Sequence, residues 1–240
     1  MRKLLLPLLV AATFSAPVVI AADFSENIKQ AMASDIRSDR ETKRDRNRKP
    51  VDTLKFFGIQ DDWKVLEIVP GGGWYTKLLA PALRDNGQFY LSLGTKRLKD
   101  SLLTKKPFDK VKLVGSEGYE FKDLNFEVTD LDAVLTFRNY HNFDESERIS
   151  ANKAAFNSLK PGGVYGVVDH TRRHMQKKND ENGRRFDPVL AIKEIQQAGF
   201  VLVDYSNLHY KIDDELRFEV GRKTVQGNSD RFTLLFKKPK

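Results

Sequence analysis

From residue 64 onward, the sequence alternates short apolar runs with stretches of helical periodicity, and this alternation constrains the fold more than any other feature. Strands that alternate with helices along a chain form a parallel sheet that those helices cover on both faces. The run at residues 131–137 is almost entirely apolar, as expected for a strand buried on both sides. Seven runs read as strands: residues 65–69, 89–93, 111–114, 131–137, 164–168, 200–205 and 231–236.

Helical periodicity separates several of these runs, at residues 74–84, 145–159 and 187–198. We therefore expect an α/β fold: a Rossmann-like, doubly wound, mostly parallel seven-stranded sheet with helices on both faces. A chain of 240 residues supplies one core of good size rather than two. We assign residues 50–240 to this single domain.

The first 22 residues have the features of a secretory signal peptide. Arg2 and Lys3 form a basic start, an apolar stretch follows, and Ala21 or Ala22 offers a cleavage point. An uncleaved membrane anchor is the alternative, but prolines interrupt the short apolar run, and no later stretch is apolar enough to span a bilayer. We therefore expect an exported protein, in a bacterial periplasm, with no integral membrane segment once the leader is removed. The chain has no cysteine, which excludes disulfides and thiolate chemistry.

Residues 23–49 form a charged segment in which basic and acidic side chains are interleaved. The interpretation that we favour is a solvated helix or arm; the alternatives are a cap over a ligand cleft and a nucleic-acid patch. The acids offset the bases, and no aromatic residue stands among the bases of residues 37–49, so we expect no nucleic-acid partner. A small-molecule substrate is the expected partner, and nothing in the sequence predicts an oligomeric state.

A glycine turn follows the first strand directly and leads into a helix. The turn reads Pro70-Gly71-Gly72-Gly73, with Glu67 near the end of the strand before it. Parallel sheets bind ligands at the carboxyl ends of their strands, where glycines let the backbone approach a ligand and a helix start offers unpaired N–H groups. The Glu67 carboxylate suits a cationic or hydroxyl-rich ligand. The sequence therefore predicts a ligand site around this turn.

The spacing of the glycines tests one class of ligand. A dinucleotide loop has the pattern G-x-G-x-x-G, and its third glycine is Thr76 in this chain. The acid that binds the ribose in such proteins, roughly 20 residues further on, is also missing. After the second strand the chain offers Gly94, Lys96 and Arg97 instead, and these bases suit a 2′-phosphate. An NADP oxidoreductase therefore stays open as an alternative.

Residues 65–76 resemble the first motif of class I S-adenosylmethionine-dependent methyltransferases. More closely, they are similar to a predicted and often exported subgroup whose loop is written E-x-x-P-G-G-G-W-Y-T. Residues 132–142 and 159–170 resemble the fourth- and fifth-strand motifs of that subgroup, and residues 187–188 and 229–232 also match. The resemblance covers the chain from about residue 48 onward and implies S-adenosylmethionine as the cofactor. It implies these cofactor-binding residues: Glu67, Pro70, Gly71, Gly72, Gly73, Tyr75 and Gly94.

Two positions depart from the superfamily pattern. Val69 stands where the first glycine of the usual loop is found, and no acid follows the second strand to hold the adenosine ribose. The resemblance therefore supports the fold more strongly than the activity. A non-catalytic module that binds another small ligand on the same fold is the alternative to methyl transfer to a small-molecule or envelope acceptor.

Polar side chains at the ends of the fourth and fifth strands are the candidate catalytic residues. Arg138, Asn139 and His141 follow the fourth strand, and His170 ends the fifth. We expect them to face the methyl acceptor, with His141 as a candidate general base because its ordinary pKa is near neutral. His174 lies four residues after His170, and on a helix the two imidazoles could bind a metal together with Asp169, but the surrounding residues read as a polar loop. We therefore expect no metal site.

Overall fold

The computed structural model describes residues 24–240, so the predicted signal peptide lies outside the described residues. A seven-stranded sheet has the order β3-β2-β1-β4-β5-β7-β6, and β7 alone runs antiparallel to its neighbours. The predicted α/β fold with a mostly parallel seven-stranded sheet is confirmed. The strands are β1 (Lys64–Ile68), β2 (Gln88–Ser92), β3 (Lys112–Leu113), β4 (Leu131–Phe137), β5 (Leu159–His170), β6 (Val201–Ser206) and β7 (Arg231–Lys237).

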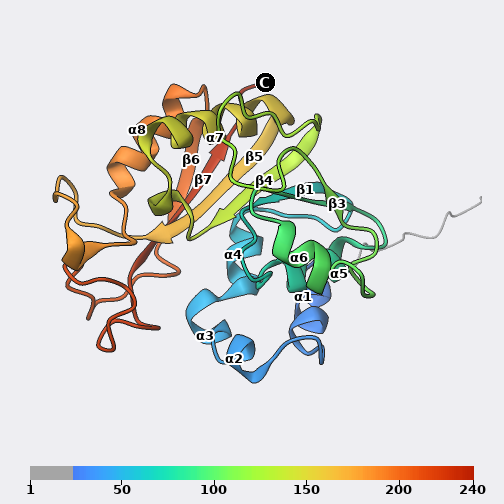
Figure 1. Ribbon diagram of the computed structural model, residues 1–240, viewed down its shortest axis with the longest axis horizontal. Coiled ribbons are helices and arrows are strands. Elements are labelled where there is room, and N and C mark those ends of the chain that lie inside the picture. Colours follow the sequence, from blue (N-terminus) through green and yellow to red (C-terminus); the bar gives the residue numbers. More distant parts are fainter. Residues whose placement is uncertain (1–23) are drawn as a thin grey trace, which may run out of the picture.

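Helices cover both faces of this sheet, as Figure 1 shows. One face carries α1 (Phe24–Met32), α4 (Pro50–Phe56), α5 (Thr76–Leu83) and α6 (Lys96–Ser101), whose apolar side chains share one buried core with the sheet. The other face carries α7 (Glu145–Ser158) and α8 (Pro188–Gln197), which pack in a second core. Four short elements complete the set: α2 (Asp39–Thr42), α3 (Asp45–Arg48) and the 3-10 turns η1 (Tyr140–Asn142) and η2 (Asp180–Asn182).

Local signals in the sequence explain where the two helices of the second core begin. The Asp144 carboxylate accepts a hydrogen bond from the Glu147 backbone N–H, and the Glu147 side chain accepts one from the Asp144 N–H. Asp187 also caps α8 with its carboxylate, and Pro188 is the first helical residue. Both helices therefore begin within one residue of the sequence prediction.

Strand β5 is longer than the sequence predicts. The sequence predicts a helix up to residue 159 and a strand from residue 164, yet the structure includes the Pro161-Gly162-Gly163 stretch between them in β5. Gly162 N–H donates to the Lys238 carbonyl beyond β7 at 2.9 Å. A Cβ at Gly163 would lie only 3.0 Å from the Leu131 carbonyl, so glycine allows β4 and β5 to approach here. Pairing with neighbouring strands thus overrides the local signal for a turn.

The charged segment is not a solvated arm. Phe24, Ile28 and Ala31 of α1 are buried in the same core as α5. Further along, the Arg37 guanidinium is buried and paired with both carboxylate oxygens of Asp45. The alternation of acids and bases therefore reflects pairing within the segment as well as exposure, and residues 24–49 pack as part of the same unit. No helix within residues 24–240 has the length and apolar character needed to cross a membrane.

Candidate functional site

A sizeable cavity lies where the strand order changes direction. Sheet order switches between β1 and β4, the position at which open α/β sheets bind ligands. A cavity of about 940 Å³ opens at the carboxyl ends of these two strands, between Glu67 and Val69 on one side and Phe137 on the other. This volume falls in the range of small-molecule sites, which is roughly 300–1,000 Å³. We call it the strand-switch cavity.

The glycine turn forms the floor of the strand-switch cavity. Pro70, Gly71 and Gly72 line it, and a Cβ placed on either of these two glycines would meet no other atom within 4 Å. Gly71 has a φ of +59°, a conformation that suits glycine. The turn is therefore open backbone that a ligand can approach closely, as the sequence predicts.

Gly73 has a different role from the predicted one. It does not line the cavity, and a Cβ there would lie 3.1 Å from Leu98 and 3.2 Å from Leu102. With its φ of +75°, it closes the turn and lets α6 pack against the start of α5. The last glycine of the turn thus serves helix packing, and only the first two face the cavity.

Val69 adopts a conformation that normally belongs to glycine. Its φ is +53°, which is rare for a β-branched residue and strained by about 1–3 kcal/mol. Its N–H donates to the Ser92 carbonyl at 2.9 Å, and its own carbonyl accepts from the Asn139 amide at 2.9 Å. These two hydrogen bonds hold the strained backbone in place. Asn139 lines the cavity, but its amide positions the turn rather than facing an acceptor.

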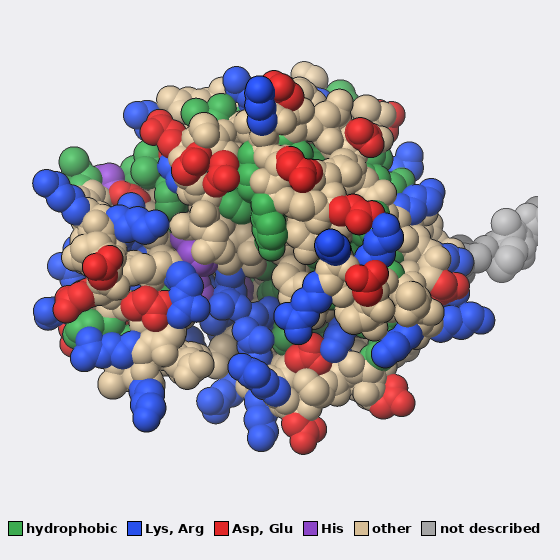
Figure 2. Space-filling model, in the orientation of Figure 1, with side chains coloured by type: hydrophobic (Ala, Val, Ile, Leu, Met, Phe, Trp, Pro, Cys, Tyr) green, Lys and Arg blue, Asp and Glu red, His purple; other side chains and the backbone are tan. Residues whose placement is uncertain are grey.

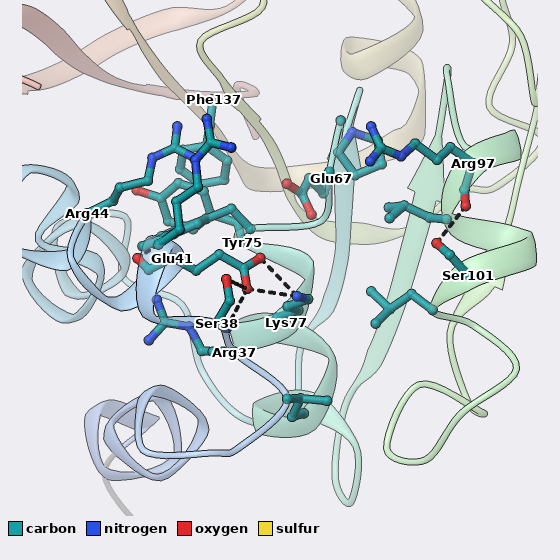
Figure 3. A pocket seen from close by; sticks show the side chains of 18 of the residues that line it. Arg37, Ser38, Glu41, Arg44, Glu67, Tyr75, Lys77, Arg97, Ser101 and Phe137 are labelled. Atoms are coloured by element: carbon teal, nitrogen blue, oxygen red, sulfur yellow. Dashed lines mark hydrogen bonds and ion pairs between the residues drawn. The ribbon is translucent and has the colours of Figure 1, made fainter. Parts of the chain in front are cut away.

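Glu67 is the buried acid of the site, with a residue exposure of 3%. Thr76 Oγ1 donates to its Oε2 at 2.7 Å. Burial raises the pKa of Glu67 to about 7, although the Thr76 hydrogen bond and the Arg48 charge act in the opposite direction. Figure 3 shows its carboxyl group between an aromatic pair on one side and the α6 side chains on the other. A cationic ligand would find a single buried acid here.

An aromatic pair and helix α6 form two walls of the cavity. The rings of Tyr75 and Phe137 are stacked, with centroids 3.5 Å apart and an angle of 12° between their planes. Opposite them, Arg97 and Ser101 of α6 line the side that follows β2 (Figure 3). Gly94 does not line the cavity, contrary to its prediction as a ligand-binding residue. Its φ of +65° suits glycine, and a Cβ there would meet the end of the exposed Tyr119 ring.

The NADP hypothesis depended on two bases after β2. Arg97 lines the cavity, whereas Lys96 is exposed and does not. The basic pair predicted for a 2′-phosphate is therefore reduced to one side chain. Among the described residues, the cavity wall on this side also has no acid, in agreement with the departure noted in the sequence.

The charged segment closes over the cavity. The Glu41 carboxylate pairs with Lys77 of α5 at 2.8 Å, and Trp74 Nε1 donates to the Glu41 carbonyl at 3.0 Å. The guanidinium groups of Arg37 and Arg48 lie over the Trp74 ring, 5.1 and 4.3 Å from its centroid. The segment is thus a cap over the ligand cleft, which the sequence favoured less than a solvated arm.

His141 does not face the cavity, so its predicted role as a general base is not supported. Its residue exposure is 7%, and its Nδ1 donates to Asp169 Oδ1 at 2.7 Å. The other oxygen of Asp169 accepts from the His141 backbone N–H at 2.8 Å. This buried pair joins the ends of β4 and β5. His141 therefore holds the strand ends together.

His170 and Arg138 belong to a second, adjoining pocket of about 460 Å³. His170 Nε2 accepts from Arg138 Nε at 2.9 Å, so Nδ1 carries the proton and donates to Ser229 Oγ at 2.9 Å. Burial, followed by the charges of Arg231 and Arg138, lowers the pKa of His170 well below its usual value, and the ring is neutral. Arg138 lines both cavities.

The side chains considered for a metal site each have other partners. His174 Nδ1 pairs with Asp187 at 3.0 Å. His170 instead hydrogen-bonds to Ser229, and Asp169 hydrogen-bonds to His141. Within residues 24–240, no group of three histidine or carboxylate side chains is arranged to hold a metal ion.

Sequence reasoning missed three residues that shape the site. His209 Nδ1 contacts Thr233 Oγ1 at 2.7 Å, and its Nε2 contacts the Arg48 carbonyl at 3.0 Å. Burial lowers the pKa of His209 to about 4, so this neutral ring ties the cap to β7. Arg48 and Arg231 were also missed. The only signal for Arg231 was its place in the motif before the last strand.

The strand order, the antiparallel β7 and the glycine turn after β1 together define the class I methyltransferase fold. The chain matches no known family model, and no curated protein matches its sequence. Its similarity to solved structures is extensive. A SAM-dependent methyltransferase from Aquifex aeolicus has a TM-score of 0.60 and 15% identity, covering 90% of this chain and 99% of that one.

Two further solved structures show how widely this fold is used. Human N-acetylserotonin methyltransferase in complex with SAM has a TM-score of 0.57 and 12% identity, covering 91% of this chain and 57% of that one. The [4+2]-cyclase SpnF has a TM-score of 0.59 and 16% identity, covering 80% of each chain. At such identities the likeness establishes the fold, and the chemistry has to be argued from the site.

Proposed function

We propose that the protein is an S-adenosylmethionine-dependent methyltransferase that acts on a small-molecule acceptor. The observation that carries the proposal is the open backbone of Gly71 and Gly72 beside the buried acid Glu67, at the switch in strand order. The predicted signal peptide and the resemblance to exported methyltransferases support an acceptor in the cell envelope. The human methyltransferase of the same fold was solved with SAM, but it is only 12% identical to this chain, so cofactor binding is the first property to test.

The residues present fit this cofactor, with one difference. Its ammonium group and ribose hydroxyls are hydrogen-bond donors, and Glu67 is a buried acceptor in the cavity. The open turn at Gly71 and Gly72 lets a nucleoside approach the backbone. On the side where related proteins place a ribose-binding acid, this chain presents Arg97 and Ser101. We therefore expect the ribose to be held by different contacts from those of other methyltransferases.

When bound, the cofactor supplies an electrophilic methyl group on a sulfonium. Glu67 and the open backbone of Gly71 and Gly72 would hold the cofactor, and that methyl group would be available to a nucleophilic acceptor beside it. His141 is outside the cavity, and both ring nitrogens of His170 are engaged. This chain therefore contributes by orienting the acceptor and excluding water, which suffices for many group transfers.

Calorimetric titration with S-adenosylhomocysteine and S-adenosylmethionine tests the proposal. We expect Gly72→Val to weaken binding by roughly ten-fold or more, because its side chain would project into the open cavity without backbone strain. Gly183→Val is the matched control, since Gly183 lies outside the cavity and has room for a side chain. An absence of binding heat at millimolar concentrations of both ligands would overturn the proposal.

A further inference from the structure

A second pocket adjoins the strand-switch cavity and is lined by six arginines. Its volume is about 460 Å³, and it lies between the cap and the loops that precede β7. Figure 2 shows Lys and Arg side chains gathered around a hollow in this region. We call it the arginine pocket. Its arginines are Arg40, Arg44, Arg48, Arg138, Arg184 and Arg231, and the first four also line the strand-switch cavity.

The protein balances only part of the positive charge of the arginine pocket, through the attraction of Asp169 to Arg138 and Arg231. Among residues 24–240, no Asp or Glu lines the pocket. Of its six arginines, only Arg184 forms an ion pair with a described residue, Glu219. Outside the pocket, buried Arg148 pairs with Glu194 at 2.7 Å and buried Arg185 with Asp214 at 2.9 Å, whereas Arg172 is buried without an ion pair to any described residue. The contrast indicates that the remaining counter-charge of this pocket comes from outside the chain.

Two of the unpaired arginines are buried. Arg48 has a residue exposure of 6%, and Arg231 has 8%. Arg231 Nη1 donates to the Asn47 carbonyl at 2.7 Å, but its buried Nε has no hydrogen-bond partner among the described residues. Burial, together with the charges of neighbouring guanidinium groups, lowers the pKa of Arg231 to about 10. An unpaired buried charge is strongly unfavourable, so a site that keeps it gains most when an anion enters.

The chain fixes these arginines in place without neutralising them. The neutral ring of His209 holds the backbone of Arg48. Asp214, which is buried and paired with Arg185, also accepts from the Asp230 N–H at 2.6 Å, directly before Arg231. The backbones at Arg48 and Arg231 are therefore held in place, while Arg231 Nε keeps an unused donor that a ligand could meet. A planar guanidinium donates two parallel hydrogen bonds to phosphate or carboxylate oxygens.

We propose that the arginine pocket binds an oxyanionic group with two or more negative charges, a phosphate ester or a polycarboxylate, carried by the methyl acceptor. The role as acceptor site rests on the proposed function; the anion site itself rests on the unpaired arginines. The cofactor's own carboxylate is a poorer occupant, because Glu67, Gly71 and Gly72 line only the strand-switch cavity. The four shared arginines connect the two cavities, so an acceptor anchored in one can reach the other.

Thermal unfolding and calorimetric titration with inorganic pyrophosphate and with citrate, at constant ionic strength in chloride, test the anion site. We expect one or both to raise the unfolding temperature and to bind with a dissociation constant in the micromolar to millimolar range, since a ligand that binds only the native state stabilises it. Binding of pyrophosphate but not citrate would identify the ligand group as a phosphate ester. Binding of citrate but not pyrophosphate would identify it as a polycarboxylate. Binding of neither at about 10 mM would overturn the inference.

Three variants locate the binding. Arg231→Met is expected to weaken anion binding by roughly ten-fold or more, because it removes a buried donor. Arg184→Met changes an exposed rim residue that does not threaten folding, and we expect a weaker but measurable loss. Arg46→Met is the control: it removes the same charge from α3, but Arg46 is exposed and lines neither cavity. The proposed location would be contradicted if Arg184→Met bound the anion as tightly as Arg46→Met while Arg231→Met either failed to fold or bound the anion with wild-type affinity.

Titration of the same samples with S-adenosylhomocysteine separates this inference from the proposed function. Arg184 and Arg231 do not line the strand-switch cavity, so both variants should keep nucleoside binding. Wild-type protein that binds pyrophosphate or citrate but no nucleoside would overturn the methyltransferase proposal and leave the anion site standing. Nucleoside binding without anion binding would overturn the anion site alone.

Discussion

Glu67→Gln isolates the cost of burying the acid at the centre of the site. Glutamine has nearly the same shape as glutamate, and its carbonyl oxygen can still accept the hydrogen bond from Thr76 Oγ1 that Glu67 accepts at 2.7 Å. The substitution therefore removes a titratable charge and leaves the packing in place. Any difference that depends on pH between the two proteins then reports on the carboxyl group itself.

The magnitude follows from the pKa of Glu67, which burial raises from 4.5 to about 7. Since a tenfold change in an acid dissociation constant is worth about 1.4 kcal/mol, the ionised carboxylate costs the native state about 3 kcal/mol. Between the two pKa values the native form keeps a proton that the unfolded chain has lost. The free energy of unfolding therefore falls as pH rises through this window, and the full cost is present above about pH 7.

Urea unfolding of the ligand-free protein at several pH values between about 4.5 and 8.5 measures this cost. We expect the two proteins to have similar stability near the acidic end and Glu67→Gln to be more stable by about 3 kcal/mol at the alkaline end. The difference between the two curves cancels the titration of all other groups. A constant difference across the whole range, or a variant that is less stable at about pH 8, would refute the reasoning.

Glu41→Gln is an informative control because its pH dependence should have the opposite sign. Burial opposes ionisation of Glu41, but hydrogen bonds from Lys77 and Ser38 outweigh it and lower the pKa of Glu41. Ionised Glu41 therefore stabilises the native state above its unfolded pKa, and this stability is lost as pH falls through its native pKa. Glu41→Gln should be less stable than wild type at about pH 8, with the difference narrowing in acid.

Three further predictions concern residues around the site. Val69→Gly should change the free energy of unfolding by less than about 1 kcal/mol, because relief of backbone strain offsets the lost burial. The control Val65→Gly in β1 should lower that free energy by about 3 kcal/mol or more. Equal losses for the two variants in urea unfolding would contradict the strained conformation of Val69. Glu194→Leu should cost about 3–5 kcal/mol in thermal unfolding because it leaves Arg148 buried and unpaired, and adding Arg148→Met should recover most of that loss. His141→Gln should lower stability by about 1–3 kcal/mol yet leave S-adenosylhomocysteine affinity unchanged in calorimetry, since His141 lies outside the cavity.

The positions of residues around the glycine turn could be predicted from short stretches of sequence. Glu67, Gly71 and Gly72 follow one another between a strand and a helix, so their position at the edge of the sheet follows from the local pattern. Local pattern does not distinguish glycines that face a ligand from glycines that face a helix. Gly73 packs against α6 and Gly94 against Tyr119, contacts that only the folded chain reveals.

Features that join distant parts of the chain were missed. The arginine pocket combines the cap with residues such as Arg138, Arg184 and Arg231, and the sequence gives no sign that arginines so far apart converge. The balance of acids and bases in the charged segment favoured a solvated arm, because burial of Arg37 and Arg48 depends on the Trp74 ring beneath them. Likewise, the early start of β5 comes from pairing of Leu159 with Leu131 of β4 and of Gly162 with Lys238, rather than from its own residues.

The place of β7 in the sheet has a consequence for the order in which parts of the protein fold. This strand comes last along the chain, yet it lies between β5 and β6, which have no ladder with each other. Strands β1 to β5 can pair and the glycine turn can form before β7 is present, whereas β6 has β7 as its only strand partner among the described residues. Arg231 and the partner of His209 arrive only with that final strand. The nucleoside cavity can therefore take shape before Arg231 completes the anion site.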